Sequence, residues 1–245
     1  MKTLNQYIQE KLIINKDYVD NAIVVKSVNE LRKIIKDRYK KLGPGTEQNP
    51  IDFNDIDVSN LDSFYDKNAG KFGKGLFENI QFKYIDISDW DVSNVMTMNC
   101  MFAYCIELKS VGDISKWNVS KVTNMYCMFL NCKFFNQDLS GWDVSNVTDM
   151  SCMFFTCEKL ESIGDISKWD ISNVTDMSHM FSKCKKFNQN LSEWNVSNVI
   201  NMSFMFYNCV SFNQDISKWN VSNVRYHLAM FHNCQIKEEY KPKFK

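Results

Sequence analysis

The sequence predicts an α+β repeat solenoid: a stack of similar coils, each with one short strand and one short helical turn, closed by a helical cap at the N-terminal end. The first observation is a tryptophan that recurs at spacings of 27, 25, 27, 25 and 25 residues. A fixed period in this range is typical of stacked supersecondary units. The second observation is that six cysteines recur in the same phase, and the third is an apolar content of 44%, which is enough for a continuous core. The tryptophans expected in that core are Trp90, Trp117, Trp142, Trp169, Trp194 and Trp219.

Residues 1–50 do not repeat, and we interpret them as an N-terminal helical cap or anchoring segment. Apolar residues within 4–12 have the spacing of a short amphipathic helix. A second helix is predicted to begin at Ser27, because Ser27 and Glu30 have the spacing of a capping box. It is predicted to end at Gly43-Pro44-Gly45. The apolar face of this helix consists of Leu31, Ile34, Ile35 and Tyr39.

The coils from Trp90 onward share the pattern W-x-x-S-x-V-x-x-M-x-x-M-F-x-x-C, which drifts only in the last copy. In the coil that starts at Trp142, apolar residues from Val147 fall at positions i, i+3, i+7 and i+10, which predicts one face of a short helix. Residues 138–144 have the pattern of an extended segment and are predicted to supply the strand. Because no coil can bury both of its faces alone, the stability of each coil must come from its neighbours.

The repeats define a solenoid of about seven coils over residues 51–236. The first coil is degenerate: Ile56 stands in the tryptophan position, and a loop insertion occupies residues 62–74. The last coil also departs from the consensus, as capping of a repeat array requires. Residues 237–245 form a charged C-terminal tail that contains Pro242, and we expect this tail to fray.

The cysteines follow the phase of the repeat. An odd count of nine in this arrangement favours buried structural thiols over a disulfide framework. Coils of a stack lie about 4.8 Å apart, so disulfides between neighbouring coils stay open as an alternative. A metal site is less favoured, because the tighter cysteine spacings of zinc sites are missing. Six cysteines share one repeat position: Cys105, Cys132, Cys157, Cys184, Cys209 and Cys234. Three lie five residues earlier in successive coils: Cys100, Cys127 and Cys152.

The M-F-x-x-C-x-x-F step and the D-I/L-S-x-W-D/N-V-S-N-V-T-x-M run resemble the BspA-type leucine-rich-repeat surface proteins. They are still more similar to the repeat family of about 25 residues first noted in Mycoplasma lipoproteins. The best copies are residues 135–157 and 187–209, and the resemblance spans residues 54–234. It implies a leucine-rich-repeat-like solenoid of bacteria and their phages, a surface protein or adhesin, with no enzymatic activity.

Composition bounds the partners and the location. The 29 basic and 29 acidic residues cancel, so no net charge favours nucleic acid. No segment has the roughly 18 apolar residues that a transmembrane helix needs, and no signal peptide, lipobox or wall anchor is visible. The resemblance implies the cell surface or a phage particle, and the missing signal peptide leaves a cytoplasmic location open. The oligomeric state also stays open.

Catalytic and cofactor-binding residues are not indicated. The chain has three histidines, and it contains no phosphate-binding glycine loop, nucleophile elbow or HExxH motif. We interpret His179, which stands in the position of Cys152 one coil earlier, as a core or edge residue. Asp or Asn recurs at residues 86, 113, 138, 165, 190 and 215. Such a column can bind calcium, but we favour the interpretation that these side chains tie turn backbones together from coil to coil.

The most probable function is a non-enzymatic recognition module that binds protein or carbohydrate on a cell surface. Binding residues are expected where the sequence changes from coil to coil while the frame stays fixed, and apolar members on a polar face suit such a partner. The alternative is a structural or assembly component, for example of a phage particle, docked through residues 1–25. The candidate binding residues are Tyr104, Phe134, Phe155, Lys183 and Tyr207.

Overall fold

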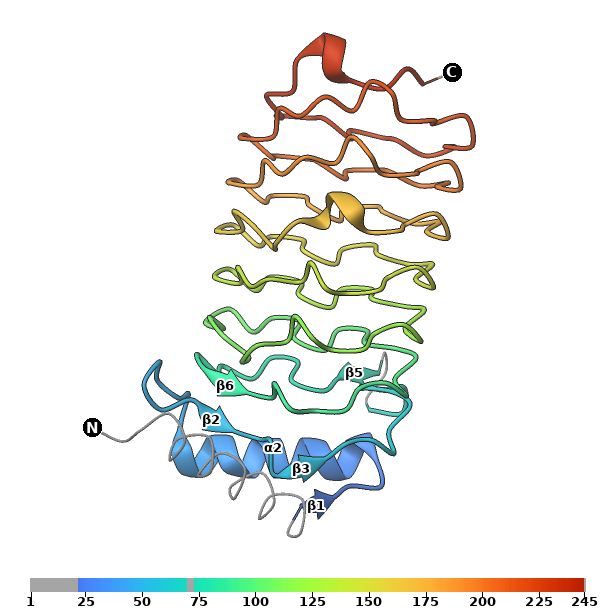
Figure 1. Ribbon diagram of the computed structural model, residues 1–245. Coiled ribbons are helices and arrows are strands. Elements are labelled where there is room, and N and C mark those ends of the chain that lie inside the picture. The colour runs from blue at the N-terminus through green and yellow to red at the C-terminus, as the bar shows by residue number, and fades with distance from the viewer. Residues whose placement is uncertain (1–21, 70–72, 245) are drawn as a thin grey trace, which may run out of the picture.

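The computed structural model describes residues 22–69 and 73–244, so the helix predicted within residues 4–12 lies outside the described part. The chain winds into coils that stack along one axis from the N-terminal to the C-terminal end (Figure 1). Parallel bridges join each coil to the next at one residue, and from Thr97 onward they are spaced by 27, 25, 27, 25 and 25 residues. This is the spacing of the tryptophans. The bridging residues are Ser63, Thr97, Asn124, Asp149, Asp176, Asn201 and Tyr226.

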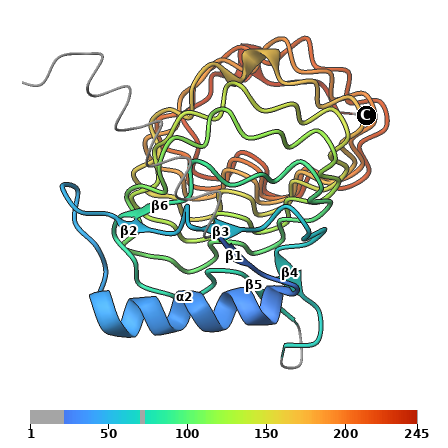
Figure 2. The same ribbon diagram turned by 60° about the horizontal axis from the view of Figure 1, so that its bottom comes forward.

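Helix α2 (Val28–Leu42) lies across the N-terminal end of the stack (Figures 1 and 2). Its apolar residues Leu31 and Ile35 are buried against the first coil. The equally buried Arg32 donates a hydrogen bond to the main-chain carbonyl of Gly75. The helix therefore covers the first coil with an apolar face and supplies donors to its free carbonyl groups.

The ends of α2 have identifiable caps. The Ser27 hydroxyl accepts a hydrogen bond from the Glu30 N–H at 3.2 Å. The Glu30 carboxylate accepts from the Lys26 N–H at 2.9 Å, one residue before the position that a capping box uses. At the other end Gly43, with φ 75°, donates its N–H to the Tyr39 carbonyl at 2.8 Å. A left-handed residue after the last turn is what a glycine supplies at little cost.

The strands are two residues long and lie in the first coils. Strands β1 and β3 pair in parallel, as do β2 and β6, whereas β4 and β5 pair antiparallel. The insertion predicted as a loop at residues 62–74 is therefore built around a small hairpin, β4–β5. The strands are β1 (Ile23–Val24), β2 (Ile51–Asp52), β3 (Ile56–Asp57), β4 (Tyr65–Asp66), β5 (Lys74–Gly75) and β6 (Ile85–Asp86). Two short 3-10 helices follow, η1 (Ile166–Lys168) and η2 (Glu238–Tyr240).

The helical turn predicted in each coil is wrong. From residue 147 to 157 the chain forms successive turns, in which Met153, Phe155 and Cys157 donate their N–H groups to carbonyls three residues earlier. The alternate N–H groups leave the coil: that of Cys152, for example, donates to the Ser178 carbonyl of the next coil at 2.8 Å. Cys152 and Thr156 have φ values of 57° and 64°, which no right-handed helix contains. Apolar residues three or four apart thus come from turns and not from a helix.

The strand predicted at residues 138–144 is also wrong. Ser140 and Gly141 form a turn there. Within this segment, one main-chain N–H donates to the next coil, that of Leu139 to the Ile163 carbonyl at 2.9 Å. The bridge to the next coil instead falls at Asp149, within the segment expected to be helical.

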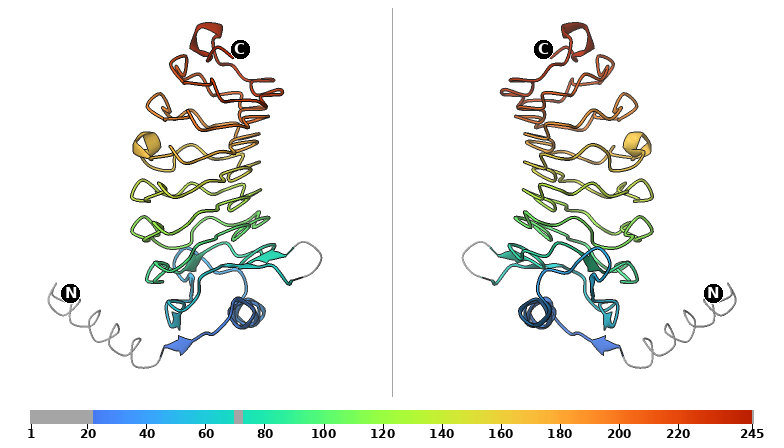
Figure 3. Two further views of the ribbon diagram at one scale, coloured as in Figure 1. Left: turned by 90° about the vertical axis from the view of Figure 1, so that its right-hand side faces the viewer. Right: turned by 90° about the vertical axis from the view of Figure 1, so that its left-hand side faces the viewer.

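The core consists of side-chain columns that run along the stack. Phenylalanines of successive coils stack face to face from Phe77 to Phe231, with ring centroids 5.2–5.9 Å apart. All six tryptophans are buried. Five of them donate their indole N–H to a carbonyl of the preceding coil at 2.8–3.2 Å, whereas Trp117 has no described acceptor. Seen edge-on, the coils form successive layers with α2 end-on beneath the first (Figure 3).

The C-terminal edge of the stack is open. In each of the five coils between residues 98 and 208, N–H groups at four positions of the turn segment donate to carbonyls of the next coil. In the last coil none of the equivalent four N–H groups donates to another described residue. The side chains beside them are exposed, Tyr226 at 61% and Leu228 at 70%. The four unpaired donors belong to His227, Ala229, Phe231 and Asn233.

The charged tail, expected to fray, packs on the last coil as far as it is described. The carbonyl of Tyr240 accepts a hydrogen bond from the Ile216 N–H at 3.0 Å. The ring of Phe244 stacks on His227, with centroids 4.2 Å apart. The aromatic residues between the tail's charges explain the difference, because they cover apolar side chains that no further coil covers.

Candidate functional site

The outer face is the side of the turn segments that points away from the core. In residues 149–157 the methionine and phenylalanine side chains at 150, 153 and 154 are buried, while Cys152, Phe155 and Thr156 are partly exposed. The equivalent positions lie on the same side in the other coils, although Ala103, Cys127 and Ser182 are buried there. Because the backbone of these segments repeats closely, the outer face differs between coils only in its side chains.

One group of these side chains forms an aromatic strip over four successive coils. Its members are Phe155, His179, Phe204, Tyr207 and His232. The ring centroids of neighbouring members lie 5.5, 4.7, 5.7 and 5.0 Å apart along the strip. The rings are half-buried or exposed, so they present a continuous apolar surface outside the core.

Three of the five residues predicted to bind a partner lie at this strip. Phe155 and Tyr207 are members, and the ammonium group of Lys183 lies 5.5 Å from the centroid of the Phe155 ring. This distance allows a cation–π interaction. The structure therefore brings together residues that are separated by about two coils in the sequence.

The other two predicted residues lie apart from the strip. Tyr104 is 47% exposed and occupies the position of Lys183, but Asn131 and Thr156 separate the two along their column. Phe134 is 39% exposed and lies beyond the turn segment, where the Lys109 ammonium group is 5.9 Å from its ring centroid.

Sequence reasoning missed His179, Phe204 and His232 as site residues. His179 and Phe204 occupy the repeat position that holds cysteine in the three earlier coils, which favoured a structural interpretation. Their φ values of 57° and 59° turn these side chains outward, next to the rings of the neighbouring positions. The usable signal was the loss of cysteine at this position from His179 onward.

His179 is the titratable member inside the strip. Partial burial lowers the pKa of its imidazole, and the charge of Asp176 opposes this shift. Its Nδ1 atom is buried and has no described hydrogen-bond partner. The neutral imidazole is therefore the form that fits between the rings of Phe155 and Phe204.

In the three coils before that of His179, the repeat position of His179 and Phe204 holds Cys100, Cys127 and Cys152. We call these three residues the outer cysteine column. The six other cysteines form an inner cysteine column. In each of these the thiol donates to a main-chain carbonyl of an earlier coil, at 2.8–3.1 Å for the five fully buried members and 3.6 Å for Cys234. All nine cysteines are free thiols.

The aspartate and asparagine column makes local bonds. The side chain of Asp138, for example, accepts a hydrogen bond from the N–H of Ser140 two residues later at 2.8 Å, and the other members do the same. The prediction that this column ties one coil to the next is therefore wrong. That role belongs to other asparagines, such as Asn146, whose amide donates to the Ser120 carbonyl at 2.7 Å. Within residues 22–69 and 73–244, no group of three metal-ligating side chains could hold an ion.

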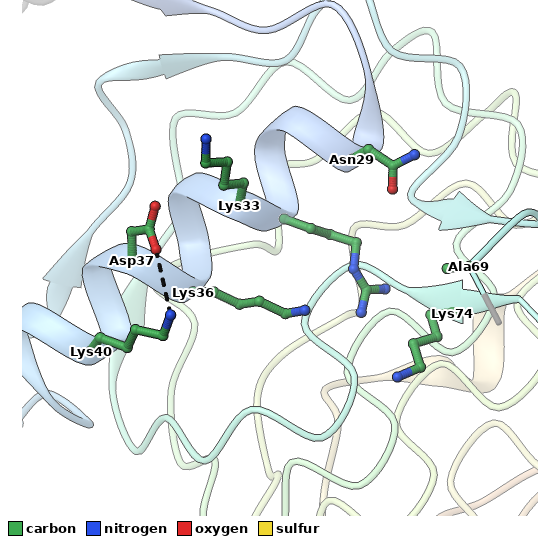
Figure 4. Close-up of a pocket in the computed structure, with 8 residues that line it drawn as sticks. Asn29, Lys33, Lys36, Asp37, Lys40, Ala69 and Lys74 are labelled. Carbon is green, nitrogen blue, oxygen red and sulfur yellow. Dashed lines mark ion pairs between the residues drawn. The ribbon is translucent and has the colours of Figure 1, made fainter.

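A basic cavity of about 520 Å³ lies between α2 and β5 (Figure 4). In the figure the ammonium groups of Lys36 and Lys74 point into the space between these elements, while Lys33 points away. Asp37 contributes the one carboxylate of the lining and lies 3.8 Å from the Lys40 ammonium group. These basic residues surround Arg32, whose guanidinium donates to a carbonyl of the first coil, so we interpret them as part of the N-terminal cap.

Coils that repeat in backbone and core, with variation limited to the outer face, define a repeat protein. The family described as "Mycoplasma protein of unknown function, DUF285" matches residues 72–165 and 156–241, and the chain belongs to this family. This confirms the coarser part of the resemblance, a Mycoplasma repeat family. No curated protein and no solved structure matches the chain. In the described part of the chain, no helix is long and apolar enough to cross a membrane.

Proposed function

We propose that this chain is a non-enzymatic recognition module, an adhesin-like surface protein that binds protein or carbohydrate through its outer face. Its coils would then be those of a leucine-rich-repeat-like solenoid of the BspA type. Membership in a Mycoplasma repeat family is compatible with a surface repeat protein. The cell surface is the location that follows from this proposal.

The observation that carries the proposal is the aromatic strip. Aromatic side chains supply a large contact area with few rotatable bonds, so little entropy is lost when a partner covers them. Such residues are also enriched where binding energy concentrates. Lys183 at one end and the exposed His232 at the other add hydrogen-bond donors at the rim. The strip is thus an apolar centre with polar ends, which suits a sugar ring or a peptide.

The test compares two sets of substitutions on the outer face. The strip variant carries Phe155→Ser, Phe204→Ser and Tyr207→Ser, and the control carries Tyr104→Ser and Phe134→Ser, which lie outside the strip. Both are measured with the wild type on a printed glycan array and on immobilised extracellular proteins, and their melting is followed by circular dichroism. We expect the strip variant to lose binding and the control to keep it. Equal binding by both would contradict the assignment of the strip.

The location is tested by protease accessibility on intact cells or particles beside a lysed sample. Digestion of the intact sample is expected for a surface protein. Digestion only after lysis would contradict the adhesin-like function.

A second candidate, an assembly component, is favoured by the open C-terminal edge. Its four N–H groups repeat the positions that donate in the earlier coils, and they can donate to a row of carbonyl groups in an extended segment of another subunit. Deleting residues 2–21, which leaves β1 and the buried Val25 in place, tests the predicted docking segment, and Leu228→Lys tests the edge. Loss of incorporation into particles by either variant, with unchanged melting, would favour assembly over recognition.

A further inference from the structure

The outer cysteine column places three thiols one above another in successive coils. Cys100 donates its N–H to the Tyr126 carbonyl at 2.9 Å, and Cys127 donates to the Ser151 carbonyl at 3.0 Å. Their φ values of 54°, 55° and 57° are nearly identical, so the side chains leave the backbone in the same direction. Neighbouring coils of such a ladder lie about 4.8 Å apart. This is within the Cα separations of about 4.4–6.8 Å at which disulfides form.

The middle thiol of the three contacts both of its neighbours. The thiol of Cys127 is in hydrogen-bonding contact with those of Cys100 and Cys152 and with the Tyr126 hydroxyl. These hydrogen bonds lower the pKa of the Cys127 thiol, although burial opposes the shift. The same contact raises the pKa of Cys100 and Cys152. The hydrogen bonds therefore favour a thiolate at the middle sulfur over one at either neighbour.

Access differs along the column. Cys127 is 4% exposed, whereas Cys100 and Cys152 are half-buried, and all three lie on the outer face. Oxidation at Cys127 therefore requires a reagent as small as hydrogen peroxide, whereas the half-buried Cys100 and Cys152 also suit a bulkier thiol reagent. Each inner thiol donates a hydrogen bond to a main-chain carbonyl. Among the described residues, none of the three outer thiols has such a bond.

We propose that the outer cysteine column is a thiol-oxidation site, at which a hydroperoxide oxidises Cys127 and the thiol of Cys100 or Cys152 then closes a disulfide between coils. The site does not depend on the recognition function proposed above.

The reaction has two steps. The Cys127 thiolate attacks one oxygen of hydrogen peroxide, an S–O bond forms, the O–O bond breaks, and the hydroxide that leaves takes a proton and becomes water. The neighbouring thiol then attacks the sulfenic sulfur, an S–S bond forms, and the S–O bond breaks with release of a second water. Two thiols are oxidised to one disulfide, one peroxide is reduced to two waters, and the third thiol stays free.

The test treats the reduced full-length protein with hydrogen peroxide and maps disulfides by mass spectrometry without reduction. The tryptic peptides 84–109, 122–133 and 134–159 each carry one cysteine of the outer column and one of the inner column. Fragment spectra therefore assign the bond. We expect a Cys127–Cys100 or Cys127–Cys152 link, and a higher melting temperature of the oxidised protein.

Variants separate this site from non-specific oxidation. Cys127→Ser should lose every disulfide of the outer column, because Cys100 and Cys152 are two coils apart, about twice 4.8 Å, which exceeds disulfide range. Cys100→Ser and Cys152→Ser should each keep the other bond. Melting by circular dichroism checks that the three variants fold. Three results would overturn the proposal. They are an outer-column disulfide in the Cys127→Ser protein, a disulfide in the inner column, and nine free thiols in the wild type after prolonged incubation with excess hydrogen peroxide.

Discussion

The inner and outer cysteine columns rise through the same coils at the same interval, yet their thiols have different surroundings. Each inner thiol donates to a main-chain carbonyl, as that of Cys157 does to Phe129 at 3.1 Å, and burial raises its pKa. Among the described residues, the outer thiols have one another and the Tyr126 hydroxyl as hydrogen-bond partners. The position of a side chain relative to the carbonyls of the preceding coil therefore decides whether the same residue type is inert or reactive.

The same contrast applies to the two faces of the turn segments. The inner face carries the phenylalanine, methionine and tryptophan columns and hardly changes from coil to coil. The outer face changes from cysteine to histidine to phenylalanine at one position, residues 152, 179 and 204. Substitutions on the inner face should therefore change the free energy of unfolding, and those on the outer face should change chemistry or binding.

The largest expected effect is that of Trp142→Ala on the inner face. The indole is buried, stacks on Trp117 at 6.4 Å and donates to the Ile114 carbonyl at 2.8 Å. Removing it leaves a cavity and takes one of two hydrogen bonds from the Ile114 carbonyl, which still accepts from the Trp117 N–H, so we expect a loss of about 3–5 kcal/mol. Urea unfolding of the variant and the wild type measures it. Unchanged unfolding would mean that the tryptophan column does not support the core.

Replacing one cysteine of each column by serine tests whether the inner and outer columns differ in their contribution to the free energy of unfolding. Cys157→Ser replaces a fully buried thiol by a smaller and more polar hydroxyl, which loses core contacts even where it keeps the Phe129 carbonyl as acceptor, and it should cost about 1–3 kcal/mol. Cys152→Ser lies on the half-buried outer face and should change the free energy of unfolding by about 0.5 kcal/mol or less. The two variants are compared in one urea titration series. Equal costs would break the distinction between the columns.

A smaller effect separates packing from hydrogen bonding within the tryptophan column. Trp142→Phe removes the bond to Ile114, whereas Trp117→Phe removes none, because the Trp117 indole has no described acceptor. The first variant should be less stable than the second by about 1 kcal/mol. Thermal and urea unfolding of the pair give the difference, and a smaller cost at Trp142 would contradict it.

The smallest effect concerns pH and the outer face. Because the pKa of His179 is lowered in the folded protein, the unfolded chain takes up a proton first as the pH falls below about 6.5. The free energy of unfolding should therefore decrease from pH 7 towards pH 5 on account of this residue. His179→Phe, which copies Phe204 of the next coil, should flatten that part of the pH profile. The urea midpoints of the variant and the wild type are measured from pH 7 to pH 5. An equal decrease in both proteins would refute the prediction.

The sequence predicted the features that depend on the repeat phase. The tryptophan and cysteine spacing gave the register of the coils, and Ile56 stands in the tryptophan position as expected: Trp90 donates to the Phe53 carbonyl, three residues before Ile56. The helix that begins after Ser27 and ends at Gly43 could also be predicted, because its caps are local.

The conformation within a coil could not be predicted. A chain of turns that close over three residues places apolar side chains at nearly the spacing of a helix. The alternate N–H groups pair with a coil about 25 residues away, and no local pattern marks that choice. Left-handed residues usually indicate glycine, but here they are Cys152 and Thr156. For the same reason the outward direction of His179 and Phe204, and with it the aromatic strip, was not evident.

Most main-chain hydrogen bonds between coils run from an N–H group of one coil to a carbonyl of the next coil, and this shared direction gives the whole stack an electrical polarity. In each coil more main-chain N–H groups point towards the C-terminal end than towards the N-terminal end, so partial positive charge accumulates at one end, as the peptide dipoles of a helix do. The last coil shows donors alone, since the carbonyls of His227, Ala229 and Phe231 are already bonded within their turns. Two such ends brought face to face would offer donors to donors. The stack therefore resists joining tail to tail with a copy of itself, although the four N–H groups of its last coil have no acceptor among the described residues. At the opposite end, Arg32 and Arg38 of α2 donate to main-chain carbonyls.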